Sequence, residues 1–280
     1  YDSTAVHSLE LLASSLHGML TSNANRWFQL RYKEAILNDS DEAKEWLEDA
    51  MDKMYIAFAR SNFQQEIFEN YHDLIAFGTS CLFIEEDKDD IIRFSARHIK
   101  EIYITENEKG FVDTIYRKFK MTAKAALERF GKENISRDLT VKFTKTPFDD
   151  VEIVHVVRPR NIFNPNKLDK QNMPFQSVYM EYETGHIISI GGFREFPYVV
   201  PRYLKASNEI YGRSPGMNSL PDVKVLNKMV EVSLKAAQKQ VDPPLLVPDD
   251  AMILPVRTAP GSLNYYRSGS RDRIESLNIG

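Results

Sequence analysis

One long helical pattern, bounded by two helix-breaking signals, constrains this chain more than any other feature of its sequence. Ser219 can cap the start of this helix, with Asp222 three residues later as its capping-box partner and Pro221 tolerated in the first turn. The tandem prolines of Asp242-Pro243-Pro244 cannot continue a helix, so the pattern ends at Val241. The sequence therefore predicts a helix of roughly six turns at about 3.6 residues per turn.

The surface of this helix divides into one polar strip and two apolar flanks. At about 100° per residue, the polar strip covers roughly a third of the circumference and holds Lys224, Asn227, Lys228, Glu231, Lys235, Gln238 and Lys239. The first apolar flank holds Val223, Leu226, Val230, Leu234, Ala237 and Val241, and the second holds Val225, Met229, Val232 and Ala236. Because a surface helix needs only one apolar stripe, two flanks indicate neighbours on both sides.

Two arrangements satisfy this pattern. In the first, the helix lies at the centre of a large globular core. In the second, it is one member of a ring of identical helices, and its lysine strip faces a central channel.

The remainder of the sequence predicts an α+β fold, with helices first and a mostly antiparallel sheet after them. Residues 2–20 and a region from the Asp39-Ser40-Asp41 cap to Gly78 have helical spacing. The aromatic side chains of the second region, such as Trp46 and Phe58, and Trp27 in the break between the two regions, are expected in the core. Strand patterns pair residues 79–85 with 91–95, 99–105 with 111–120, and 175–183 with 186–190; residues 151–158 form a further strand, 123–130 a short helix and 161–174 a loop.

Composition and charge limit the function classes. A net charge of −4 argues against a protein that holds nucleic acid over a large basic surface. The lone cysteine, Cys81, excludes an intramolecular disulfide and is expected to be a small buried apolar residue. No run approaches the roughly 18 apolar residues of a membrane span, so no membrane partner is expected. The start without Met and the end at Gly280 suggest a piece of a longer protein.

The sequence gives little support for catalysis. Residues 85–90, EEDKDD, could serve a metal-dependent nuclease, but consecutive residues of a turn point in different directions, which favours a solvated hairpin tip. His155 lies within a strand pattern and is expected to be a satisfied sheet residue, and the other histidines are scattered. Phosphate-loop, nucleophile-elbow and zinc motifs are absent. We therefore expect no catalytic, cofactor-binding or metal-binding residues, no cofactor and no enzyme activity.

Three segments carry a resemblance to a known family. They are YDSTAVHSLELLASSLHGMLTSNANRWFQL at residues 1–30, REFPYVVPRYLKASNEIYGRSP at residues 194–215, and YGRSPGMNSLPDVKVLNKMVEVSLKAAQKQVDPPLLVPDD at residues 211–250. Together they resemble the head-to-tail connecting (portal) proteins of short-tailed bacteriophages. Because the segments lie at both ends in the family's order, the resemblance covers essentially the whole chain.

The resemblance implies a structural ring, usually of twelve subunits, at one vertex of the capsid of a virion assembled in the host cytoplasm. Double-stranded DNA passes through the ring without sequence readout, and the partners are further copies of the chain, the terminase packaging motor, tail adaptor proteins, and scaffold and capsid proteins. Residues 1–212 then correspond to the wing, 213–241 to the first stem helix and 242–280 to a proline-rich, extended clip. The second stem helix, the channel loop and the crown would follow Gly280.

The same resemblance assigns roles to the helix surface. The expected subunit contacts are Val223, Leu226, Val230, Leu234, Val225, Met229 and Val232. The expected channel lining is Lys224, Lys228, Lys235 and Lys239. Two other functions stay open at this point: a generic α+β phage scaffold or adaptor protein, and a metal-dependent phage nuclease.

Overall fold

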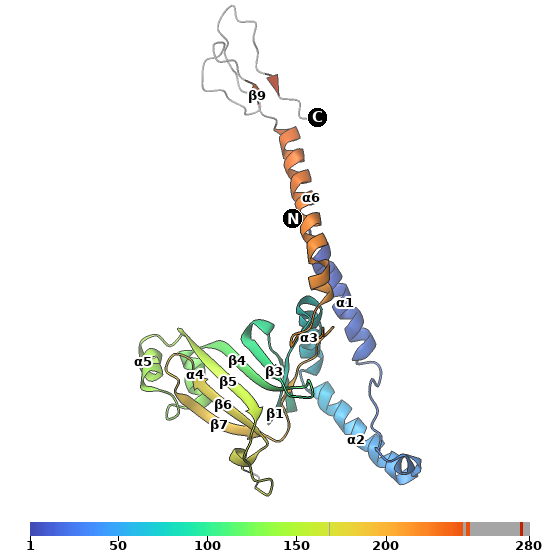
Figure 1. Ribbon diagram of the computed structural model, residues 1–280, viewed down its shortest axis with the longest axis vertical. Coiled ribbons are helices and arrows are strands. Elements are labelled where there is room, and N and C mark those ends of the chain that lie inside the picture. Colours follow the sequence, from blue (N-terminus) through green and yellow to red (C-terminus); the bar gives the residue numbers. More distant parts are fainter. Residues whose placement is uncertain (168, 243–244, 247–274, 277–280) are drawn as a thin grey trace, which may run out of the picture. The chain divides into compact units, whose positions relative to one another are not determined.

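The computed structural model of the chain describes residues 1–167, 169–242, 245–246 and 275–276 (Figure 1). The chain has the predicted α+β class, with helices and antiparallel sheets in the described residues. It divides into two compact units. The larger comprises residues 6–219, and the other combines residues 1–5 with the chain from Leu220 onward.

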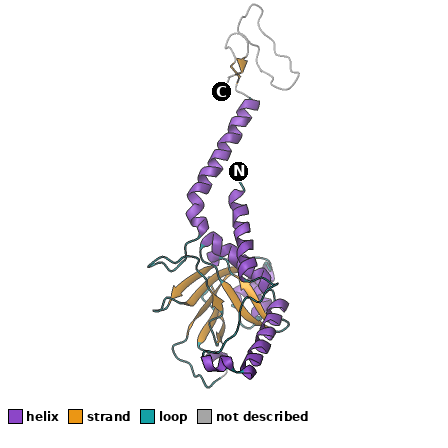
Figure 2. Cartoon of the chain, turned by 90° about the vertical axis from the view of Figure 1, so that its right-hand side faces the viewer, coloured by secondary structure: helices purple, strands orange, loops and turns teal. Residues whose placement is uncertain are grey.

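The helices of the described residues are drawn in purple in Figure 2. They are α1 (Thr4–Leu20), α2 (Asp41–Arg60), α3 (Phe63–Phe77), α4 (Ala123–Phe130), α5 (Arg137–Lys145) and α6 (Pro215–Val241), with short 3₁₀ turns at Ala35–Asp39, Ile99–Glu101 and Lys170–Asn172. Gly78 ends α3 in the left-handed conformation (φ 77°), as its position predicts. The Thr122 hydroxyl caps α4 by accepting from the Ala125 N–H.

The second helical region is broken into α2 and α3 because Asn62, between them, bonds to another element. Its side-chain amide donates to the Phe94 carbonyl at 2.8 Å, and its side-chain oxygen accepts from the Phe94 N–H at 2.9 Å. Both backbone groups of Phe94 are therefore satisfied by one side chain. Through these two hydrogen bonds, the corner between α2 and α3 is attached to strand β2, which contains Phe94.

Two antiparallel sheets account for most strands of the described chain. A three-stranded sheet has the order β2 (Ile91–Ala96), β1 (Leu82–Asp87), β8 (Tyr198–Val199); a five-stranded sheet has the order β3 (Ile102–Glu106), β4 (Val112–Thr122), β5 (Asp150–Pro159), β6 (Phe175–Glu181), β7 (Ile187–Phe193). A short pair, β9 (Leu245–Leu246) with β10 (Glu275–Ser276), lies in the smaller unit. The expected hairpins are confirmed.

One face of the five-stranded sheet is covered by two packing partners. At one end, α4 and α5 pack on Phe119 and Ile153 through a buried cluster. At the other end, Phe83 of β1 joins Ile115 and Val157 in a second cluster. A third cluster places Trp27 against Phe63, with parallel rings 5.7 Å apart, which confirms Trp27 as a core residue.

Two expectations about the larger unit are wrong. Trp46 was expected in the core but is 61% exposed, because its neighbours on α2, such as Met51, supply the buried side of the helix while Trp46 only stacks on Tyr32 at the surface. Helix α5 lies in a stretch for which no helix was predicted. Leu139 is the one buried side chain of this helix, so the sequence shows too little apolar periodicity to predict the helix.

His155 links the two sheets from within the core. Its Nδ1 lies 3.0 Å from the Tyr198 hydroxyl on β8, and its Nε2 lies 2.9 Å from the Ser177 hydroxyl on β6. Its ring stacks on Tyr179 at 3.9 Å. Burial, followed by the positive charge of nearby arginines such as Arg117, lowers the pKa of His155 to about 3. The neutral imidazole is thus the expected satisfied sheet residue.

This burial predicts a defined pH dependence of stability. The unfolded chain binds a proton at an ordinary histidine pKa of about 6.5, whereas the folded chain does not until about pH 3, so stability falls as the pH falls through that window. Replacing His155→Gln should reduce the slope of unfolding free energy between about pH 6 and 4.5 by about 1.4 kcal/mol per pH unit. Urea unfolding at several pH values measures this slope, with the exposed His186→Gln as the control; an unchanged slope in His155→Gln contradicts the prediction.

Candidate functional site

The start of α6 is held by an unusually close approach of two backbone segments. A Cβ atom on Gly212 would lie 2.2 Å from the Gly78 carbonyl oxygen, and one on Gly78 would lie 2.5 Å from the Gly212 carbonyl oxygen. The Gly212 N–H donates to the Thr79 hydroxyl at 2.7 Å. Only glycine fits at both positions, so the YGRSPG segment brings its backbone directly against the end of α3.

Ser214 completes this anchor. Its buried hydroxyl donates to the Ala76 carbonyl at 2.8 Å and accepts from the Met217 N–H at 2.8 Å. The same side chain therefore caps the first turn of α6 and satisfies a carbonyl in the last turn of α3.

The predicted cap of α6 at Ser219 is wrong. The helix begins at Pro215, and Ser219 is exposed, its hydroxyl donating to carbonyls of its own helix at Pro215 and Gly216. Ser214-Pro215 carries a similar signal five residues earlier, and here the proline directly follows the serine, in the first helical position. Pro221 consequently lies inside the helix, which remains continuous (Figure 1). The predicted end at Val241 is confirmed.

A three-residue ion-pair network organises the polar strip. The Glu231 carboxylate accepts from Lys228 at 3.0 Å and from Lys235 at a shorter distance. Hydrogen bonds from Lys235 first and Lys228 second lower the pKa of Glu231, while the bond to Glu231 raises the pKa of Lys235. Two of the four strip lysines thus share one carboxylate, which reduces the net positive charge of the strip.

The N-terminal residues contact α6 at Asn227, which belongs to the polar strip. The Asp2 N–H donates to the Asn227 side-chain oxygen at 3.0 Å. Val223, Asn227, Val230 and Glu231 lie along one face at helical spacing, and these four are half-buried. The polar strip is therefore bordered on the Asn227 side by a less exposed face of the helix.

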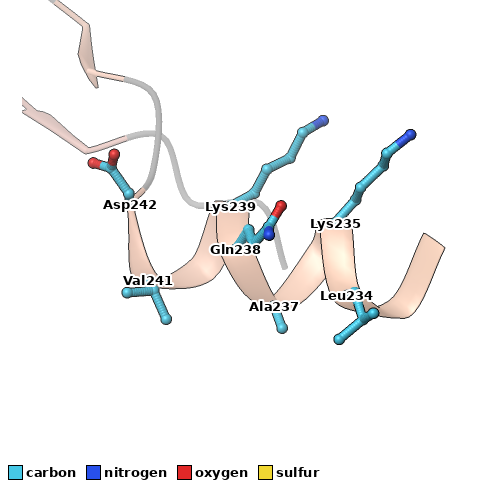
Figure 3. Close-up of a pocket in the computed structure, with 7 residues that line it drawn as sticks. All are labelled: Leu234, Lys235, Ala237, Gln238, Lys239, Val241 and Asp242. Carbon is cyan, nitrogen blue, oxygen red and sulfur yellow. The ribbon is translucent and has the colours of Figure 1, made fainter. Parts of the chain in front are cut away.

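Apart from the half-buried Val223 and Val230, the valine, leucine and methionine side chains on the apolar flanks of α6 are exposed. No side chain of α6 is buried within the described chain, which does not fit the alternative of a core helix. On the second flank, Val225, Met229 and Val232 are all more than half exposed, with Met229 at 63%. In the last turns, Figure 3 shows Lys235 and Lys239 extending from one side of the helix and the Leu234, Ala237 and Val241 side chains from the opposite side. The predicted division into a lysine strip and apolar flanks is thus visible in three dimensions.

Chemistry-bearing residues elsewhere have structural roles. In the acidic run, Asp87 accepts from the backbone N–H groups of Asp89 at 2.8 Å and Asp90 at 3.1 Å, which lowers the pKa of Asp87 and forms the hairpin turn. Cys81 is buried, and burial raises the pKa of its thiol to about 12. Across the described residues, no group of three or more His, Cys, Asp or Glu side chains could hold a metal ion. Within the same residues, no helix has the length and apolar character of a membrane span.

Comparison with known proteins gives concordant matches. The model of the bacteriophage head to tail connecting protein family matches residues 1–279. The chain is similar to a probable portal protein of Bordetella phage BPP-1, with 31% identity over 267 residues, and to a portal protein of Salmonella phage epsilon15, with 30% identity over 268 residues. Each alignment covers 94% of this chain and 48% of the relative. The chain thus spans about half the length of these curated relatives.

The corrected helix start leads to a prediction that separates two serines. Ser214→Ala removes the cap and leaves the Ala76 carbonyl without its donor, so we expect a loss of about 1–3 kcal/mol in unfolding free energy. Ser219→Ala removes an exposed hydroxyl and should change stability by less than about 0.5 kcal/mol. Urea unfolding of the two variants measures the difference. Equal effects would contradict the assignment of Ser214 as the cap.

Proposed function

Because the chain belongs to the bacteriophage head to tail connecting protein family, we propose that it is a structural portal subunit that assembles into a ring. Double-stranded DNA is packaged and ejected through this ring at one capsid vertex of the virion. The observation that carries the proposal is the family match over residues 1–279, and the exposed flanks of α6 support it. The role is that of a conduit, without enzyme activity or cofactor.

The proposed parts follow the chain order. Residues 1–212 form the wing, 213–241 the first stem helix and 242–280 the clip; the proposed clip lies almost entirely outside the described residues. The anchor formed by Gly78, Gly212 and Ser214 supports a boundary between residues 212 and 213, because it would join the proposed wing to the proposed stem helix at one defined point. The proposed partners are other copies of the chain, the terminase motor, tail adaptors, and scaffold and capsid proteins.

The two apolar flanks of α6 form the proposed stem contacts. Each buried Val, Leu or Met side chain contributes roughly 1.5–3 kcal/mol relative to an exposed one. Leaving residues such as Val225, Met229 and Val232 in water is therefore unfavourable, and a helix of a neighbouring copy is a surface of the same chemistry. Closed rings repeat this contact at every subunit boundary, so each subunit would be held from both sides.

The lysine strip is the proposed channel lining. Ammonium groups bind phosphates without reading bases, and their contacts are screened by salt. Glu231 holds Lys228 and Lys235 in ion pairs, whereas Lys224 and Lys239 have no ion pair in the described chain. Partial neutralisation suits a surface along which DNA must slide without being held.

The stem contacts predict the effect of a buried carboxylate. In the protein that contains this chain, Val225→Asp together with Met229→Asp should abolish ring assembly, since an unpaired carboxylate in a helix contact costs several kcal/mol. The wing should remain folded, because both side chains are exposed in the single chain. Sedimentation velocity and circular dichroism measure these two properties. Gln238→Asp, on the polar strip, is the control, and unchanged assembly of the Val225/Met229 variant would refute the contact.

The channel assignment predicts a salt-dependent defect. Replacing Lys224 and Lys239 by Glu should slow DNA packaging or retention more at low salt than near 0.15 M, where screening already weakens contacts. The same replacement of Lys228 and Lys235 should have a smaller effect, because their charges are already shared with Glu231. Packaged DNA per particle is the measurement. Normal packaging by the quadruple variant at both salt concentrations would show that the strip is only a hydrated surface.

A further inference from the structure

The five-stranded sheet has a second face that the packing described above does not use. In register across all five strands, this face presents one apolar row: Tyr103, Tyr116, Val156, Val178 and Ile190. Val154 and Met180 form part of the next row. Tyr103, Tyr116 and Ile190 are exposed, with Tyr103 at 60%. We call the five residues of the first row the open-face row.

The alternation of side chains shows that this face is unusual for a solvated surface. An antiparallel sheet with one covered face normally alternates apolar and polar residues along each strand. In β5, Ile153 and Val157 are fully buried on the covered face, yet Val154 and Val156 on the other face are also apolar. A strand that is apolar on both sides is typical of a sheet covered on both faces.

Charged groups beside the open-face row limit the chemistry of whatever covers it. Lys118, Lys120 and Arg158 lie on this face, together with the carboxylates of Glu152 and Asp150. Glu152 pairs with Lys118 at 2.8 Å, and Lys120 is 3.9 Å away. Among the described residues, the side chain of Arg158 donates only to the neutral Gln176 side chain, at 3.2 Å. The face is therefore apolar with an excess of positive charge. A complementary surface would combine carboxylates with apolar side chains.

The tip of the β1–β2 hairpin has this complementary chemistry. Residues 85–90 contribute five carboxylates and one lysine, and Ile91 follows them directly. Ile91 is 61% exposed and has a φ of 72°, a left-handed conformation that a β-branched side chain rarely adopts. The turn bonds of Asp87 hold the tip in shape. An apolar side chain is thus presented at the end of an acidic hairpin.

The hairpin and the open-face row are on opposite sides of the five-stranded sheet. Phe83, at the base of the hairpin, packs on the face that contains Ile115 and Val157, which is the covered one. Two different, complementary surfaces on opposite sides of one body produce a head-to-tail contact that repeats from copy to copy. A second copy of this chain therefore offers a partner surface with the required carboxylates and apolar side chain, and that surface lies on the side from which a head-to-tail contact can form.

We infer that the acidic β1–β2 tip of one copy binds the open-face row of the next copy. Ile91 would contact the apolar row, and Asp89 and Asp90 would face Arg158, which lies two residues from Val156 on the same side of β5. This inference rests on the proposed ring, to which it adds a wing contact separate from α6. Electrostatic complementarity of this kind sets the direction and spacing of neighbouring copies.

A cysteine footprint tests the covered face in the protein that contains this chain. Within this chain, Cys81 is buried with a thiol pKa of about 12, so an engineered surface cysteine gives the main change in maleimide labelling. We expect Ile190→Cys to be labelled at least about tenfold more slowly in assembled protein than after dilution. Ser189→Cys is the matched control, since Ser189 is an exposed neighbour on β7 that points to the opposite face.

Sedimentation of the same samples separates the outcomes. If the protein assembles but Ile190→Cys labels as fast as Ser189→Cys, the wing contact is wrong while the proposed ring stands. If the protein does not assemble at all, the proposed function itself fails. Protection of Ile190→Cys in a monomer would show that another part of the same protein covers the face, which also overturns the inference.

A charge exchange tests the partner surface. Asp89→Lys with Asp90→Lys, and separately Arg158→Glu, should each raise the concentration needed for assembly by about tenfold. Combining all three changes should restore assembly towards the wild-type concentration. A combined variant that assembles no better than either separate variant would exclude the hairpin tip as the partner of this face.

Discussion

The contact between two glycine backbones is the constraint on which the arrangement of this chain depends. Gly78 ends α3 and Gly212 precedes α6, and the carbonyl oxygen of each fills the position that a Cβ atom on the other would need. The same few residues supply the helix stop, the Thr79 bond to the Gly212 N–H and, through Ser214, the cap of α6. Thr79 and Gly212 are 133 positions apart in the sequence, so this one junction closes the segment that contains both the three-stranded and the five-stranded sheet.

Local signals explain which elements could be predicted from the sequence. Gly78, Thr122 and the β-branched run of β5 each determine the local structure through residues only a few positions away, and each of these predictions is confirmed. The failures involve distant partners. Ser214 and Ser219 are equally good caps in the sequence, and the difference is the Ala76 carbonyl, which only tertiary structure brings to Ser214. Trp46 shows the converse, since helical spacing cannot tell which apolar residues find a core.

The candidate surface on α6 was predictable in outline because helical geometry alone divides it into strip and flanks. The ion pairs within the polar strip could not be predicted in the same way. The sequence places Glu231 among the lysines, but only the side-chain positions show that it pairs with Lys228 and Lys235 together. The contact of Asp2 with Asn227 joins the N-terminal residues to the middle of α6, and no local pattern in either segment indicates it.

Pro221 gives α6 a mechanical property that its continuous appearance conceals. It has no N–H to donate to the Met217 carbonyl, so this turn lacks one hydrogen bond of the helical ladder. One of the two divisions of the chain into compact units falls between Ser219 and Leu220, next to this turn. Helices bend at such points at the least energetic cost. The turn that contains Pro221 is therefore the point of lowest bending stiffness in α6, between the anchored first turn and the long remainder of the helix. Any bending of the helix axis would be concentrated there.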